Sequence, residues 1–246
     1  MVNVYYCGMK RKVLEICAQN IQSVLVAQEG GADRVELCSG LELGGLSPSF
    51  AFVELALQRF QGKVFVLLRP RPGHFVYSVD EVDIICRDAA VLAEMGAHGI
   101  VFGALNDKYE LDLQALAKVR NAAPDLEFTF HRALDVASKP ESLIESLIEL
   151  QIPRVLTSGA ASSAIEAHER LSKWVTNYGN EIKVLVGGGV RSSNLERLLE
   201  TGAQEFHLSA QVQIDAEKYG DLIPGDYKSS AIEEIVRCRA ILNEHT

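Results

Sequence analysis

Short apolar segments alternate with longer amphipathic segments along the whole chain. The short segments are rich in Val, Ile, Leu and Phe, which favours β-strands, and the longer ones repeat apolar residues at helical spacing. We predict eight strands, at residues 12–17, 34–38, 64–68, 99–103, 127–131, 155–158, 183–187 and 205–208. We predict eight helices, at residues 21–28, 52–60, 81–95, 111–122, 140–150, 165–178, 194–200 and 231–242.

Eight strand–helix pairs in 246 residues predict a TIM-like (β/α)8 barrel, a single domain over residues 12–246. A doubly wound open sheet is the alternative, but it usually has fewer strands and a glycine-rich turn after the first strand. We interpret residues 1–11 as an N-terminal extension. Gly96 is expected to end the third helix, and Ser229-Ser230 to cap the last one.

One motif, apolar-Glu-apolar-Cys, occurs in both of the first two predicted strands, as LEIC at residues 14–17 and VELC at residues 35–38. Alternate residues of a strand face opposite sides, and the outer helices of a barrel need apolar partners. The apolar residues of both motifs should therefore face outward. The residues expected to face the barrel interior, at the strand ends where such barrels carry out chemistry, are Glu15, Cys17, Glu36 and Cys38.

Further polar residues follow the other predicted strands. Arg69 and Arg71 are expected to clamp an anion, and a glycine-rich turn before a helix is typical of a phosphate or carboxylate site. The candidate anion-binding residues are Arg69, Arg71, Ser158, Gly187, Gly188 and Gly189. The candidate proton-transfer residues are Glu15, Glu36, His131, Asp135 and His207, with Asp135 orienting His131 or capping the next helix.

The two inward cysteines allow two interpretations. A free cysteine is commonly a small buried apolar residue, so Cys17 and Cys38 could be packing. Thiolates also select soft metals, and two of them suffice for Cu(I). The two inward glutamates, Glu15 and Glu36, could instead hold Mg²⁺ or Mn²⁺, or could pair with arginines as a structural layer.

Composition narrows the function classes. The formal net charge of −9 argues against nucleic acid as a partner, because phosphate binding needs a basic surface, and against an anionic membrane surface. No apolar run approaches the roughly 18 residues of a membrane-spanning helix, and no secretory signal is visible. Five cysteines without a C-x-x-C motif indicate a reducing, cytoplasmic environment.

Several of these segments together resemble the CutC family of copper homeostasis proteins: LEIC, GADRVELC, LGGLSPS, RPRPGHFVYS, FHRALD, VLTSG, GGGV and FHLSA. The resemblance runs from about residue 12 to residue 211. It implies a TIM-like barrel, a cytoplasmic location and homo-oligomers, most often dimers. It also implies a proposed part in copper handling, with Cu(I) at Cys17 and Cys38. The segment 212–228 has an unusual composition for a loop of this barrel.

Two hypotheses therefore stand side by side. The first is a copper homeostasis protein that binds Cu(I) through Cys17 and Cys38 at the barrel mouth. The second is an isomerase-like, epimerase-like or lyase-like enzyme that acts on a small anionic or phosphorylated metabolite, because a simple copper carrier has no need of so many charged residues at one end of the barrel.

Overall fold

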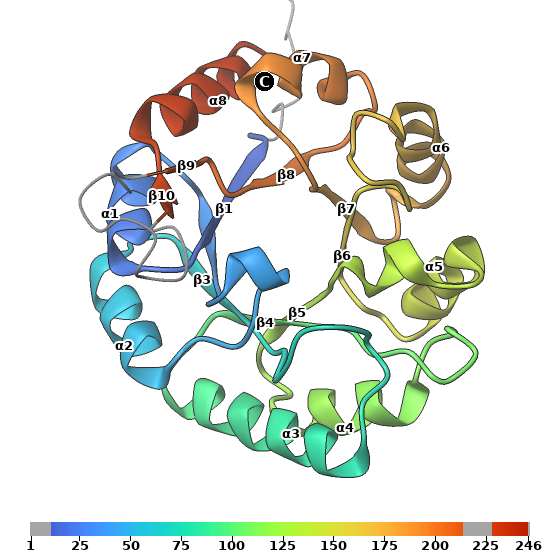
Figure 1. Ribbon diagram of the computed structural model, residues 1–246. Helices are drawn as coiled ribbons and strands as arrows, with labels where there is room; N and C mark the ends of the chain where they lie inside the picture. Colours follow the sequence, from blue (N-terminus) through green and yellow to red (C-terminus); the bar gives the residue numbers. More distant parts are fainter. Residues whose placement is uncertain (1–10, 214–227, 246) are drawn as a thin grey trace, which may run out of the picture.

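The structure is a computed structural model that describes residues 11–213 and 228–245. Eight parallel strands close into a barrel in which each strand pairs with its neighbours in the sequence, and β8 pairs with β1 (Figure 1). The predicted (β/α)8 barrel is confirmed. The strands are β1 (Val13–Ala18), β2 (Arg34–Leu37), β3 (Lys63–Leu67), β4 (Gly99–Phe102), β5 (Glu127–Phe130), β6 (Arg154–Thr157), β7 (Lys183–Val186) and β8 (Glu205–Leu208).

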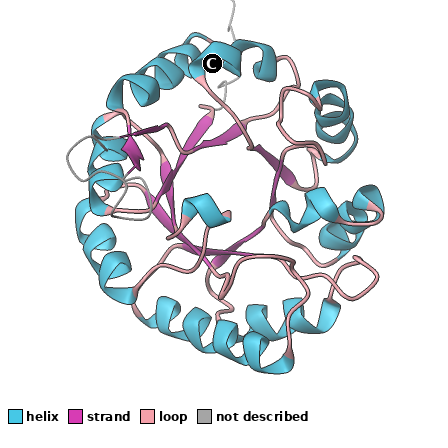
Figure 2. Ribbon diagram, viewed as in Figure 1, coloured by secondary structure: helices cyan, strands magenta, loops and turns pink. Residues whose placement is uncertain are grey.

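Helices surround the barrel as an outer layer (Figure 2). They are α1 (Ile21–Glu29), α2 (Phe50–Arg59), α3 (Val79–Glu94), α4 (Leu113–Ala122), α5 (Pro140–Glu149), α6 (His168–Tyr178), α7 (Ser192–Leu199) and α8 (Ile232–Glu244). Two 3-10 helices, η1 (Leu41–Leu43) and η2 (Arg132–Val136), follow β2 and β5. In Figures 1 and 2, η1 lies over the centre of the barrel.

The chain between β8 and α8 forms a short antiparallel pair, β9 (Gln211–Gln213) with β10 (Lys228–Ser230). Most of the unusual segment 212–228, together with residues 1–10 of the N-terminal extension, lies outside the described residues. No helix in the described ranges is long and apolar enough to cross a membrane.

Two helix ends test the sequence analysis. Gly96 follows α3 with φ +82°, as the predicted left-handed cap requires. The predicted serine cap of α8 is wrong, because Ser229 and Ser230 belong to β10 and their hydroxyl groups bond elsewhere. Ser230 donates to the backbone oxygen of Ser209, and α8 begins after Ala231 without a side-chain cap.

The strand alternation is confirmed in the first two strands. Leu14 and Ile16 are fully buried in the main apolar core, which includes buried residues of the outer helices. Cys17 and Cys38 belong to a separate apolar cluster inside the barrel, together with Phe65. Both motifs therefore place their apolar residues toward the helices and their carboxylate and thiol groups toward the barrel axis.

A network of ion pairs fills the barrel interior below the mouth. Arg34 donates to Glu15 and, at 2.7 Å, to Glu205, which also accepts from Arg154 at 2.6 Å. Both guanidinium groups lie over the ring of Phe65, at 4.9 and 5.3 Å from its centroid. This lower network, defined as Glu15, Arg34, Arg154 and Glu205, satisfies each charge with a buried partner of opposite sign, as buried ions require.

Candidate functional site

A cavity of about 270 Å³ opens among the C-terminal ends of the strands. Its floor contains Cys17, Glu36 and His207, and its sides are formed by the loops after β2, β3, β5 and β7. This is the end at which barrels of this architecture carry their sites. The remaining lining residues are Leu41, Gly44, Gly45, Leu67, Arg69, Phe75, His131, Arg132, Leu156, Gly188, Gly189, Val190, Arg191, Leu208 and Ser209.

The two thiols that were predicted to face the barrel interior lie next to each other. Sγ of Cys17 lies 3.4 Å from Sγ of Cys38, and both are free thiols. Cys17 lines the cavity, whereas Cys38 is fully buried behind it. The hydrogen bond to Cys38 and burial raise the pKa of the Cys17 thiol well above its usual value.

The two inward glutamates have different surroundings. Glu15 accepts from Arg34 and lies 2.6 Å from Nδ1 of His207, so both of its oxygens are engaged. Among the described residues, His207 is the one cationic group within 4.0 Å of Glu36, with Nδ1 3.4 Å from its Oε2, and that oxygen has no hydrogen-bond partner. Glu15 therefore belongs to a saturated network, and Glu36 does not.

These surroundings shift the pKa values in opposite directions. Burial raises the pKa of Glu15, but Arg34 and His207 outweigh it and hold that pKa well below its usual range. Burial raises the pKa of Glu36 to about 7, with the nearby His207 opposing the rise and Glu15 adding to it. Burial lowers the pKa of His207, but its contacts with Cys17, Glu15 and Glu36 raise it well above its usual value. His207 is therefore protonated at neutral pH.

Glu15, Glu36 and His207 each offer a ligand atom within 4.8 Å of the others, a spacing that suits a metal ion. However, Arg34 and His207 already occupy both oxygens of Glu15, and the proton on His207 competes with a metal. Hard divalent ions such as Mg²⁺ and Mn²⁺ prefer several free oxygen ligands, and this trio provides mainly Glu36. The divalent-metal interpretation remains a prediction that this arrangement supports weakly.

The two arginines predicted to act together are separated. Arg69 lines the cavity. Arg71 does not: it donates to both oxygens of Glu81 and to the backbone oxygen of Val76. The prediction of a paired arginine clamp is therefore wrong, because the proline-rich exit of β3 turns the Arg71 guanidinium toward the start of α3.

His131 and Asp135 are also separated. His131 is 5% exposed and lines the cavity, and its Nδ1 accepts from the backbone N–H of Ala133 at 3.2 Å. Burial, together with the nearby Arg69 cation, lowers its pKa to about 3, so the ring is neutral. Asp135 neither orients His131 nor caps a following helix, because its two oxygens bind Arg132 and the loop after β6. That part of the prediction is wrong.

The predicted anion-binding residues after β6 and β7 divide in the same way. The Ser158 hydroxyl donates to Asp135 and accepts from Arg132, and Ser158 does not line the cavity. The Gly187 N–H donates to the backbone oxygen of Thr157. Gly188 and Gly189 line the cavity with φ of +96° and +76°, a conformation that favours glycine.

Unsatisfied groups concentrate at this cavity. In the described part of the chain, five buried side-chain polar atoms lack a hydrogen-bond partner: Glu36 Oε2, Arg69 Nε, Tyr77 Oη, His131 Nε2 and His168 Nε2. Three of the five belong to residues that line the cavity. Buried polar groups without partners are rare in folded proteins, and each calls for an explanation such as a ligand.

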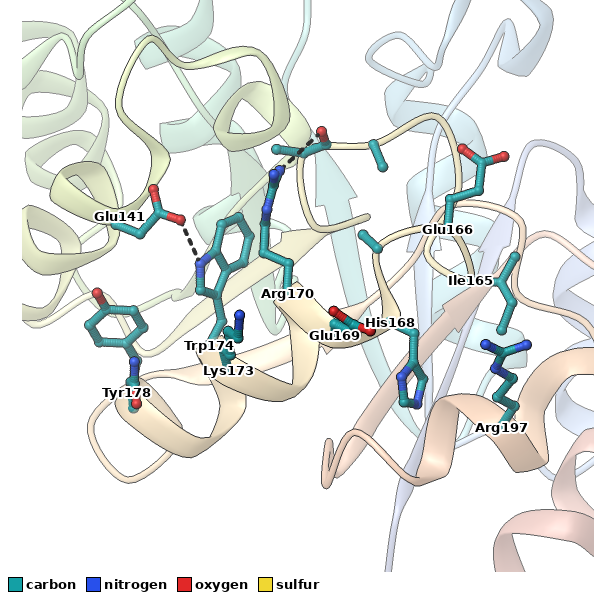
Figure 3. Close-up of a pocket in the computed structure, with 14 residues that line it drawn as sticks. Glu141, Ile165, Glu166, His168, Glu169, Arg170, Lys173, Trp174, Tyr178 and Arg197 are labelled. Carbon is teal, nitrogen blue, oxygen red and sulfur yellow. Dashed lines mark hydrogen bonds between the residues drawn. The ribbon is translucent and has the colours of Figure 1, made fainter.

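A larger hollow lies along α6 on the outside of the barrel (Figure 3). Two of its polar side chains are engaged within the protein, and one of its lining residues, His168, has an Nε2 without a hydrogen-bond partner. The indole nitrogen of Trp174 donates to Glu141 at 3.1 Å, and Arg170 donates to the backbone oxygen of Gly159 at 3.0 Å. The cavity at the strand ends is therefore the better candidate site, because it contains the Cys17 thiol and three of the five unpartnered polar atoms.

Comparison with known proteins identifies the family to which the chain belongs. The model of the CutC family matches residues 12–212. The chain belongs to the CutC family. It is 40% identical to a "family protein CutC" of Xanthomonas campestris pv. campestris (strain 8004) over 235 residues, which cover 93% of this chain and 97% of the relative. It is also 40% identical to the human copper homeostasis protein cutC homolog over 205 residues, 83% of this chain and 75% of the relative.

A solved CutC structure supports the assignment. The crystal structure of the CutC protein from Streptococcus agalactiae superposes with a TM-score of 0.77 at 30% sequence identity, covering 80% of this chain and 98% of that one. The family match spans every residue of the cavity floor.

Several residues that line this CutC-family cavity were not predicted as site residues, and Arg132, Arg191 and Phe75 are the charged and aromatic ones among them. Arg132 directly follows His131, and Arg191 follows the glycine run by two residues. Basic residues next to predicted site residues are the signal that would have identified both arginines.

Proposed function

We propose that this chain binds Cu(I) through the thiolates of Cys17 and Cys38 and takes part in copper homeostasis, the function named for its human relative. Two thiolates suffice to hold Cu(I), which prefers soft sulfur ligands. The observation that carries the proposal is the 3.4 Å separation of the two sulfur atoms, on neighbouring strands and without a disulfide.

The position of the pair suits an ion that enters and leaves. Cys17 borders the cavity and Cys38 lies behind it, so an ion that comes through the mouth meets Cys17 first. Leu67, Phe65 and Val101 form an apolar cluster with the pair, and Glu36 and His207 lie near Cys17. Apolar packing of this kind limits access of water to a soft-metal site.

Charge balance also supports the site. Two thiolates and one Cu(I) carry a net charge of −1, and the protonated His207 beside Cys17 offsets it. Because metal binding must displace the thiol protons, and the pKa of Cys17 is raised, the affinity for Cu(I) should increase with pH.

We further propose the cytoplasm as the location of the protein, since its thiols must stay reduced to bind the metal. The homodimer implied by family resemblance remains a prediction.

The proposal is tested by an anaerobic Cu(I) titration in competition with a chromogenic chelator. A Cys7→Ser background removes a thiol that lies outside the described residues. We expect this protein to bind one Cu(I) per chain with submicromolar affinity, and the further Cys17→Ser/Cys38→Ser variant to lose that binding. Cys86→Ser, on α3 outside the barrel, is the matched control and should retain it.

The thiol site is wrong if the double variant binds Cu(I) as tightly as its parent. Circular dichroism of each variant confirms that lost binding does not reflect unfolding.

A further inference from the structure

We propose that the same cavity has a second ligand: a small organic oxyanion, a carboxylate or a phosphate ester, whose charge is balanced by Arg69 and which accepts a hydrogen bond from Nε2 of His131. This site lies above the thiol pair, and its existence does not depend on copper binding.

Arg69 has a charge that lacks a counter-ion. Its side chain is buried, and no carboxylate of the described residues lies within 4.0 Å of it. Its guanidinium donates to three backbone oxygens, those of Leu43, Gly45 and Gly73. These carbonyl groups fix the position of the cation but leave its net charge in place.

The other buried arginines show that this is an exception. Arg34 and Arg154 share Glu205, and Arg239 pairs with Asp33. Unpaired buried charges are strongly unfavourable, and an arginine left without its acid is typical of a site that recognises a carboxylate or a phosphate. Arg69 also lines the cavity at the strand ends, and the other three do not.

His131 supplies a donor to the same space. Its Nδ1 accepts from the Ala133 N–H, which places the proton of the neutral ring on Nε2. That Nε2 is buried and has no partner, and the ring is held against Phe75 with centroids 4.7 Å apart. A neutral N–H donor next to an uncompensated cation suits an oxyanion and does not suit a second cation.

The loop after β7 closes the opposite side of the cavity with further donors. The N–H groups of Gly188, Gly189 and Val190 donate to no acceptor among the described residues, and all three residues line the cavity. Successive free amides before a helix bind anions, here before α7. Arg191 also lines the cavity and has no carboxylate within 4.0 Å in the described ranges.

The volume limits the ligand to a small molecule. A cavity of about 270 Å³ lies slightly below the range of pockets that hold drug-sized ligands. The proposed site keeps Arg69, Gly188 and Gly189 from the sequence analysis and replaces Arg71, Ser158 and Gly187 with His131.

The test is isothermal titration calorimetry of the reduced, copper-free protein at constant ionic strength, with inorganic phosphate, glycerol 3-phosphate and malonate as probes. We expect at least one probe to bind, and Arg69→Gln to weaken that probe about tenfold or more, as loss of a charged partner predicts. The control Arg59→Gln removes the same charge from the exposed end of α2 and should leave binding unchanged. Preference for malonate indicates a carboxylate ligand, and preference for the two phosphates indicates a phosphate ester.

A second measurement does not depend on any variant. In ¹⁵N-labelled wild-type protein, the Nε2–H resonance of His131 should shift on saturation with the bound probe. The proposal is overturned if no probe binds, if Arg69→Gln binds as tightly as Arg59→Gln, or if the His131 resonance is unaffected. Because Arg69 does not contact the thiol pair, Arg69→Gln should still bind Cu(I), which separates this outcome from that of the copper titration.

Discussion

The barrel interior contains two groups of ionisable residues that differ in how fully their polar atoms are hydrogen-bonded. In the lower network of Glu15, Arg34, Arg154 and Glu205, every charge has a buried partner. At the mouth, Glu36, Arg69 and His131 each keep a buried polar atom without a hydrogen-bond partner. Similar residue types therefore stabilise the fold in the lower network, whereas at the mouth they leave polar atoms free to bind a ligand.

The two motifs LEIC and VELC show the same contrast between their glutamates. Glu15 and Glu36 occupy equivalent positions in the motifs, yet Glu15 is held by Arg34 and His207, whereas Glu36 has only a long contact to His207. The difference arises from register, because β1 places Glu15 level with Arg34 on β2 and with His207 on β8. A repeated motif thus need not have a repeated function.

The largest effect should come from breaking the lower network. Arg34→Met leaves Glu15 and Glu205 without one of their cationic partners, which should lower the free energy of unfolding by about 3–5 kcal/mol. Urea denaturation measures this. A loss below about 1 kcal/mol would show that the network is not structural, since surface ion pairs have effects of that size.

A matched pair of substitutions sharpens the comparison between the motifs. Glu15→Gln removes a charge that two cations hold, and we expect a loss of about 2–3 kcal/mol in the free energy of unfolding. Glu36→Gln removes a carboxylate with no hydrogen bond to its Oε2, and the change should stay within about 1 kcal/mol. Equal losses in the free energy of unfolding would show that the surroundings of Glu15 and Glu36 do not differ in the way described.

A smaller effect should appear as a pH dependence due to His131. Its pKa is about 3 in the folded protein and about 6.5 when unfolded, so between those values the unfolded state binds more protons and acid favours unfolding. The charged groups that face the ring are Arg69 from the loop after β3 and Arg132 and Asp135 from η2. Between pH 7 and pH 5, wild-type should lose about 2 kcal/mol more stability than His131→Gln.

Urea unfolding of both proteins at the two pH values measures this difference. Identical losses in the two proteins would show that His131 is not buried in a neutral form.

Most of the fold could be predicted from the sequence, because each strand and helix carries its own periodicity. The alternation in LEIC and VELC was sufficient to place both thiols and both carboxylates inside the barrel. Strand register and loop conformation could not be predicted, since they depend on tertiary contacts. Register decides that Glu15 is hydrogen-bonded to Arg34 and His207, whereas Glu36 has only the long contact to His207.

Loop conformation explains the errors at the site. Arg69 and Arg71 are two residues apart, but the chain has left the strand at Arg69, so alternation no longer applies. Arg71 meets Glu81, and the 3-10 helix η2 carries Asp135 away from His131 toward the loop after β6. The unpaired state of Arg69 depends on the absence of a nearby acid, which no local pattern reports.

The central claim, that the thiol pair at the barrel mouth is a Cu(I) site, is tested most directly by anomalous diffraction at the copper edge from crystals grown anaerobically with Cu(I). We predict a single strong peak per chain between Sγ of Cys17 and Sγ of Cys38. A peak at the Glu15–Glu36–His207 group or elsewhere, with both sulfur atoms free of metal, would contradict the account.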